Sequence, residues 1–105
     1  MYLIGDIGNT ETKICLFNDK RKLLKKKIFD TNNFKKINLS DKFKFLNSYR
    51  KKIDKIIFSS VVPNVYKNVK GSIKKKLRAE VKELKQLNLK KILNIEVNMK
   101  QVGSD

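Results

Sequence analysis

Short apolar runs that end at glycine- and asparagine-containing turns constrain the first third of this chain more than any other feature. The first run ends at residues 8–10 (Gly-Asn-Thr), the second ends at residues 18–19 (Asn-Asp), and a third follows at 23–29. Such runs and turns are typical of β-hairpins, because Gly and Asn adopt the backbone conformations that tight turns require. Residues 2–29 are therefore predicted to form three antiparallel strands.

The middle of the chain then alternates between helix and strand patterns. Residues 30–39 are polar and predict a loop, after which Ser40 or Asp41 can cap a helix. A buried strand is predicted at 56–62, and Pro63 ends it because proline cannot donate a hydrogen bond to a sheet. The apolar positions of the predicted helix are Phe43, Leu46 and Ile53.

A regular apolar spacing follows the proline and predicts a helix at 64–78 with a lysine-rich outer face. Residues 80–97 fit a helix in their first part and a strand in their second, and residues 98–105 form a polar tail. Three consecutive strands followed by alternating helices and strands predict one α/β domain with a mixed sheet. The residues that recur every four positions are Val65, Val69, Ile73 and Leu77.

Composition excludes several classes of site. The chain has no histidine and one cysteine, Cys15, so zinc centres and Ser-His or Cys-His catalysis are excluded. A lone cysteine cannot form an internal disulfide, which fits a reducing compartment. No apolar run approaches the roughly 18 residues of a membrane span. Because Asp6 interrupts the apolar start, neither a membrane span nor a signal peptide is expected.

The net charge of +16 raises the question of a nucleic-acid partner. All but three of the 26 basic residues are lysines, and they are spread along the whole chain among many Asn and Ile residues. This distribution is typical of the amino-acid bias of an AT-rich genome, whereas base reading favours arginine. No RNP pattern or zinc-finger spacing is present. A nucleic-acid partner is therefore not expected, and a basic nucleic-acid-binding protein stays a lesser alternative.

The turn after the first apolar run is a candidate phosphate site. Asp6 follows an apolar strand at the turn, where a carboxylate can hold Mg²⁺ directly or through water. Gly8 lets the backbone approach a phosphate closely, and the turn amides with Asn9 and Thr10 can donate hydrogen bonds to it. The alternative is an ordinary hairpin turn in which Asn and Gly supply positive φ angles.

Two further segments can carry chemistry. Residues 59–63 (Ser-Ser-Val-Val-Pro) place two hydroxyls beside a helix start, which can face an anion, although they also suit a plain strand-to-helix connection. In residues 102–105 (Val-Gly-Ser-Asp), Asp105 can act as a general base toward a hydroxyl, and Gly103 allows a substrate to approach. The alternative there is a frayed polar terminus.

Taken together and in this order, the three segments resemble the type III pantothenate kinases. That family opens with D-[IV]-G-N-T, carries S-S-V-V-P in its first lobe and continues to V-G-x-D-R, which residues 6–10, 59–63 and 102–105 match. The resemblance implies a ribonuclease-H-like (actin-like ATPase) lobe of α/β class, with three antiparallel strands followed by alternating helices and strands. Residues 1–105 would be the N-terminal lobe of a two-lobe kinase whose second lobe is absent from this chain.

The resemblance also implies site residues. Pantothenate would contact Gly103, Ser104 and Asp105, together with Val97, which stands where the family usually has a tyrosine. Asp105 would take the proton from the hydroxyl that attacks the γ-phosphate of ATP, and Asp6 would also bind the metal. The nucleotide would be bound by Asp6, Ile7, Gly8, Asn9, Thr10, Glu11, Thr12 and Lys13.

The family phosphorylates pantothenate to 4′-phosphopantothenate, the first step of coenzyme A biosynthesis. The resemblance therefore implies a cytoplasmic homodimer that uses ATP, Mg²⁺ and a monovalent cation, K⁺ or NH₄⁺. Because the second lobe is absent, we expect the 105-residue chain to be inactive alone. The alternative is a noncatalytic homologue that binds nucleotide or dimerises.

Overall fold

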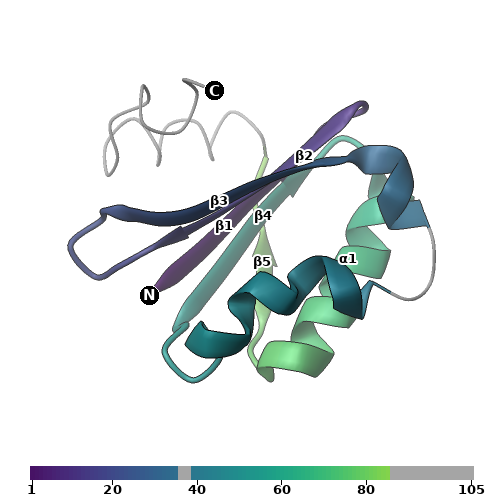
Figure 1. The fold of residues 1–105 in the computed structure, drawn as a ribbon. Helices are drawn as coiled ribbons and strands as arrows, with labels where there is room; N and C mark the ends of the chain where they lie inside the picture. The colour runs from purple at the N-terminus through teal and green to yellow at the C-terminus, as the bar shows by residue number, and fades with distance from the viewer. Residues whose placement is uncertain (36–38, 86–105) are drawn as a thin grey trace.

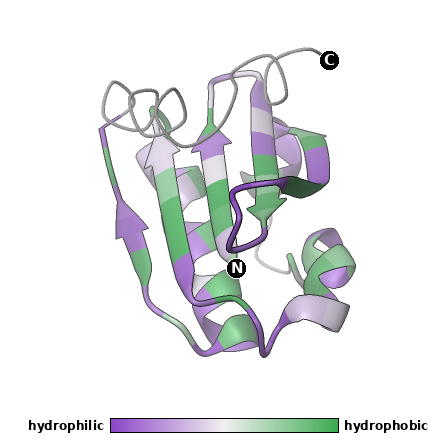
Figure 2. Cartoon of the chain, turned by 90° about the vertical axis from the view of Figure 1, so that its left-hand side faces the viewer, coloured by the Kyte–Doolittle hydropathy of each residue, from purple (hydrophilic) through white to green (hydrophobic). Residues whose placement is uncertain are grey.

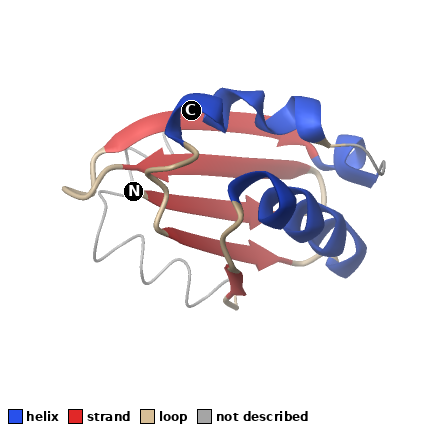
Figure 3. Cartoon of the chain, turned by 90° about the horizontal axis from the view of Figure 1, so that it is seen from below, coloured by secondary structure: helices blue, strands red, loops and turns tan. Residues whose placement is uncertain are grey.

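The computed structural model describes residues 1–35 and 39–85. Its described strands form one five-stranded sheet in the order β3-β2-β1-β4-β5. Figure 1 shows the described helices together on one side of this sheet, and Figure 3 shows the same arrangement from below. The mixed α/β architecture predicted from the sequence is therefore confirmed.

The three N-terminal strands form an antiparallel meander, as predicted. β1 (Tyr2–Ile7) pairs with β2 (Glu11–Phe17), and β2 pairs with β3 (Leu23–Asp30). The turn between β2 and β3 contains Arg21 with a positive φ of 63°, a conformation that non-glycine residues rarely adopt. β3 is the edge strand beside β2, and most of its side chains are exposed or half-buried.

The connection from β3 to β4 is more helical than the sequence indicates. Residues 30–39, predicted as a loop, include a short 3₁₀ helix, η1 (Thr31–Lys35), and residues 36–38 lie outside the described part. The helix predicted after residue 40 is also a 3₁₀ helix, η2 (Ser40–Tyr49), whose start has no side-chain cap. The predicted apolar positions are nevertheless correct, since Phe43, Leu46 and Ile53 are buried.

The second half of the described chain forms a β-α-β unit. β4 (Lys55–Ser60) runs parallel to β1, α1 (Pro63–Leu77) follows it, and β5 (Val81–Glu83) runs parallel to β4. β4 ends at Ser60 rather than at residue 62, because the Ser60 hydroxyl accepts a hydrogen bond from the Val62 amide (2.9 Å) and turns the chain toward α1. Residues 80–97, whose first part fitted a helix in the sequence, begin instead as the strand β5. Residues 86–97, where a strand was predicted, lie outside the described part.

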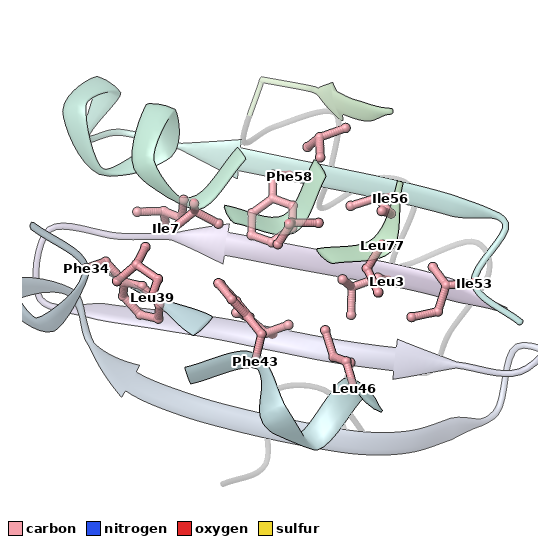
Figure 4. Close-up of a cluster of buried hydrophobic side chains, with 14 of the residues drawn as sticks. Leu3, Ile7, Phe34, Leu39, Phe43, Leu46, Ile53, Ile56, Phe58 and Leu77 are labelled. Atoms are coloured by element: carbon pink, nitrogen blue, oxygen red, sulfur yellow. The ribbon is translucent and has the colours of Figure 1, made fainter. Parts of the chain in front are cut away.

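The main core lies between the sheet and the helices. The face of β1 formed by Leu3, Gly5 and Ile7 points into this core, and so do the four regularly spaced apolar residues of α1. Figure 4 shows Leu3 and Ile7 of β1 and Leu77 of α1 in the same cluster as Phe43 and Leu46 of η2. Gly5 pairs in register with Phe58, and a Cβ on Gly5 would overlap the Phe58 ring, so glycine is required there for the ring to cross β1.

The opposite face of the sheet carries a smaller apolar cluster, and no described helix packs on it (Figures 1 and 2). Its buried members are Ile4, Cys15 and Phe17. Burial raises the pKa of the Cys15 thiol, although the charges of Lys26 and Lys13 oppose the shift. Cys15 is thus a buried, protonated strand residue with the character of a small hydrophobe.

Candidate functional site

Two of the three sequence segments meet at one edge of the sheet. β1 and β4 are parallel, so their carboxyl ends lie side by side, with Asp6 opposite Ser59 and Ile7 opposite Ser60. The amide of Val61 donates to the carbonyl of Ile7 (3.0 Å), which joins the end of β4 to the end of β1. In parallel sheets with helical crossovers, ligands bind at this carboxyl edge. The third segment, with Val97, Gly103, Ser104 and Asp105, lies outside the described residues.

The β1–β2 turn presents exposed polar residues at this edge. The Gly8 amide donates to the Glu11 carbonyl (2.9 Å) and closes the turn, which leaves Asn9, Thr10 and Glu11 exposed. Neither Gly8 nor Asn9 has a positive φ, so the ordinary-turn explanation based on such angles is wrong. The reason for glycine is space, because a Cβ at Gly8 would lie 3.0 Å from the Glu11 carbonyl oxygen.

Asp6, Lys13 and Ser59 share the face of the sheet opposite the described helices. Asp6 lies within β1 rather than after it, and its register partners are Lys13 on β2 and Ser59 on β4. Residues opposite one another on neighbouring strands point to the same face. A half-buried carboxylate and a half-buried ammonium therefore flank the β1–β2 turn on this side.

Ser59 stands out among the polar side chains of this edge. Its side chain is fully buried, and within the described part of the chain its hydroxyl has no hydrogen-bond partner. A buried hydroxyl without a partner costs free energy, so its position beside Asp6 calls for an explanation in function.

Thr12 and Lys13 point in opposite directions, although sequence reasoning grouped them. Thr12 is fully buried on the helix side, and its hydroxyl lies 2.8 Å from that of Thr31. Thr31 in turn donates to the Gly8 carbonyl (2.8 Å). Sequence reasoning missed Thr31 because it falls in a polar stretch, and no local pattern signals its contact with a turn 23 residues away.

The start of α1 lies at the same edge. Pro63 occupies the first turn, and the start of α1 has no side-chain hydrogen-bond cap. The Ser60 hydroxyl is engaged locally, since it also donates to the Val62 carbonyl (3.0 Å). The helix dipole thus directs partial positive charge toward the edge that carries the β1–β2 turn.

The donor set suits a magnesium ion that also has phosphate ligands. No group of three or more carboxylate, cysteine or histidine side chains capable of holding a metal occurs among the described residues. Mg²⁺ is commonly held by one or two carboxylates together with substrate phosphates and water. Asp6 fits that mode of binding, with the Ser59 hydroxyl, which has no hydrogen-bond partner among the described residues, in register beside it.

A separate hollow of about 330 Å³ lies at the other end of β4, away from the β1–β2 turn. It is formed by residues at the amino end of that strand and around the start of β5, so it does not belong to this site. The lining residues are Asp54, Lys55, Ile56, Ile57, Glu80 and Lys82. Over the described residues, the helices are all too short or too polar to cross a membrane.

Comparison with known proteins identifies the family. A family model for type III pantothenate kinases matches residues 2–105. The type III pantothenate kinase of Pelagibacter ubique (strain HTCC1062) is 46% identical over 105 residues, which cover 100% of this chain and 42% of that relative. The chain therefore spans less than half the length of the curated relative. Its five-stranded mixed sheet is consistent with the N-terminal lobe of an actin-like ATPase. On this evidence the chain belongs to the type III pantothenate kinase family.

Proposed function

We propose that residues 1–105 form the N-terminal, phosphate-binding lobe of a two-lobe kinase that transfers the γ-phosphoryl group of ATP to pantothenate. One observation carries the proposal: the β1–β2 turn, the end of β4 and the start of α1 share a single sheet edge. Backbone amides and a helix N-terminus at one edge favour binding of a phosphate chain.

The described residues divide the work of binding ATP. The turn of Gly8, Asn9 and Thr10, exposed at Asn9 and Thr10, offers amides and side chains to phosphate oxygens, and because Gly8 has no side chain the backbone there can approach a phosphate closely. Glu11 continues this exposed rim. Lys13 supplies a positive charge on the same face as Asp6. Ile7 and Thr12 are buried and act through the backbone they hold in place.

Metal ions complete the proposed site. Asp6 would hold Mg²⁺ with phosphate oxygens, and the ion would neutralise charge on the phosphate chain. A monovalent cation, K⁺ or NH₄⁺, and a homodimeric assembly belong to the same proposal.

The chemistry at the second substrate is proposed for the C-terminal segment. Asp105 accepts the proton of the primary hydroxyl of pantothenate, the hydroxyl oxygen bonds to the γ-phosphorus, and ADP departs as the bond to its β-phosphate oxygen breaks. Gly103, Ser104 and Val97 would contact pantothenate. Because Val97 is aliphatic, it would contribute apolar contact and no hydrogen bond.

The test uses a protein extended to the length of the relative and carrying residues 1–105 unchanged. Pantothenate-dependent ADP release is expected, and its absence would contradict the kinase proposal. Asp105→Asn should lower kcat by about 10²–10⁴ while leaving the Kd for ATP nearly unchanged. Unchanged turnover would remove Asp105 as the base.

The same extended protein tests the alternative. A nucleotide-binding homologue without catalysis would bind Mg-ATP and leave pantothenate unphosphorylated even at the length of the relative.

A further inference from the structure

We propose that Thr31, assisted by Thr12, is a positioning residue that directs the Asn9 amide of the β1–β2 turn toward the phosphates of the nucleotide. The inference rests on the nucleotide-binding part of the proposed function. It assigns a role to a residue outside the three sequence segments, on a different strand connection from the turn it serves.

The hydrogen-bond directions follow from counting protons. A threonine hydroxyl has one proton to donate and two lone pairs. The Gly8 carbonyl has no proton, so the Thr31 hydroxyl donates to it at 2.8 Å. Its proton is then used, and the Thr12 hydroxyl, 2.8 Å away, must be the donor of the bond between the two threonines. The order is therefore Thr12 to Thr31 to the Gly8 carbonyl.

Thr31 holds the turn at two points. Its hydroxyl binds the Gly8 carbonyl, and its amide donates to the Thr10 carbonyl (2.8 Å). These carbonyls belong to the Gly8–Asn9 and Thr10–Glu11 peptide groups, so one residue anchors the peptide groups on either side of the Asn9–Thr10 peptide. Because Thr31 begins η1, the anchor is continuous with the helical layer, where Asn68 on α1 donates to the carbonyl of Phe34 (3.2 Å).

The anchored carbonyls determine where the turn amides point. In a planar trans peptide the C=O and the following N–H point in opposite directions. A Gly8 carbonyl drawn inward to Thr31 directs the Asn9 N–H outward, at a residue that is itself exposed. An outward backbone amide at such a turn can donate a hydrogen bond to an anion.

Burial makes this anchor effective. Thr12 and Thr31 are 0% and 1% exposed, so water cannot replace either hydroxyl bond at low cost. Without the Thr31 hydroxyl, the Gly8–Asn9 peptide group is free to rotate, and the Asn9 N–H is no longer held in its outward orientation. Removing the Thr12 hydroxyl leaves the bond from Thr31 to Gly8 intact, so its effect is smaller.

The test measures the Mg-ATP affinity of the protein extended to the length of the relative, by calorimetric titration well below the melting temperature of every variant. Thr31→Val should weaken ATP binding by about fivefold to tenfold, and Thr12→Val by about twofold to threefold. Thr31→Ser should restore the wild-type value, because it keeps the hydroxyl. Leu77→Ala, at the far end of α1, is a matched control that lowers stability without touching the turn and should leave affinity unchanged.

Each outcome bears on a separate claim. If the wild-type chain binds no Mg-ATP, the proposed nucleotide site fails and the positioning role fails with it. If the wild type binds and Thr31→Val binds equally well, only the positioning role is overturned. If Leu77→Ala weakens binding as much as Thr31→Val does, lost stability explains the effect and the role is rejected. Should Thr31→Val not fold, equal ATP affinity of Thr12→Val and wild type would overturn it.

Discussion

The two faces of the sheet treat buried hydroxyl groups differently at the same edge. On the helix side, the Thr12 hydroxyl donates to the Thr31 hydroxyl, which donates to the Gly8 carbonyl. On the opposite side, the buried Ser59 hydroxyl has no partner among the described atoms, and it lies in register with Asp6. A buried polar group without a partner costs free energy, whereas a hydrogen-bonded one does not. In the proposals made above, the helix side shapes the turn and the other side contacts the ligand.

This division follows from the two-residue period of a strand. Along β2, Thr12 points to the helices and Lys13 points away, and along β1 the same holds for Ile7 and Asp6. Neighbouring residues of one motif thus lie on opposite faces: one packs in the core, and the other is the one for which we propose a binding role.

The largest loss of stability is expected for Gly5→Ala on the helix side. The new methyl group would overlap the Phe58 ring, which is fully buried and cannot move without disturbing the core. We expect a loss of about 3 kcal/mol in the free energy of unfolding, measured by urea denaturation. Combining it with Phe58→Leu should recover part of that loss, because the smaller side chain vacates the space. Strictly additive losses would show that the two positions do not compete for space.

A second, smaller effect is expected at Thr31. Thr31→Val leaves the buried Thr12 hydroxyl and the Gly8 carbonyl each short of a partner. The free energy of unfolding should fall by about 2 kcal/mol, whereas Thr31→Ser should lose less than half of that. Equal losses in the two variants would mean that packing of the methyl group, and not the hydroxyl, sustains this corner of the fold.

Ser59→Ala on the opposite face should change stability little. The substitution removes a buried hydroxyl that makes no described hydrogen bond, so thermal denaturation should show a shift within about 0.5 kcal/mol, in either direction. Mg-ATP binding should nevertheless weaken if this hydroxyl serves the ligand. A loss of stability as large as that of Thr31→Val would show that the Ser59 hydroxyl is as important to the fold as the hydroxyls on the helix side.

The smallest effect on stability is expected at the amino end of β1, where the chain is held by ion pairs rather than by hydroxyl hydrogen bonds. The Met1 ammonium lies 2.9 Å from Asp19, 2.8 Å from Asp54 and 2.9 Å from the Lys52 carbonyl. Burial lowers the pKa of the ammonium, but the hydrogen bonds to Asp54 and Asp19 outweigh it, and the pKa is raised above 8.0.

The raised pKa fixes the direction of the pH effect. The stabilisation is fully present below pH 8 and is lost as the pH rises through the folded-state pKa. We expect a modest fall in melting temperature across that range. An N-acetylated chain is the control, since it carries no ammonium and should be less stable below pH 8. The Cys15 thiol is present in both chains, so any pH dependence that it causes is the same in both. Identical pH profiles for the two chains would therefore show that the Met1 ammonium does not contribute to the pH dependence.

The strands β1 to β4 and the helix α1 were predictable from the sequence, whereas the strand β5 falls where the apolar spacing fitted a helix. Apolar alternation and turn residues gave β1 to β3, and the four-residue spacing from Val65 gave α1 within one residue of its observed start and end. The sequence misjudged residues 30–39 and the end of β4, because η1 is held by Thr31 and Asn68 and the β4 exit by the Ser60 hydroxyl. Side-chain hydrogen bonds of this kind leave no periodic signal.

Local patterns determined what each segment of this chain can form, since helix and strand periods are set by backbone geometry over a few residues. Tertiary structure alone decided which residues meet. The parallel pairing of β1 with β4 brought Asp6 beside Ser59, and the packing of η1 under the β1–β2 turn brought Thr31 to Gly8. Such contacts depend on burial and pairing summed over the whole sheet, and residues far apart in sequence carry no local trace of them.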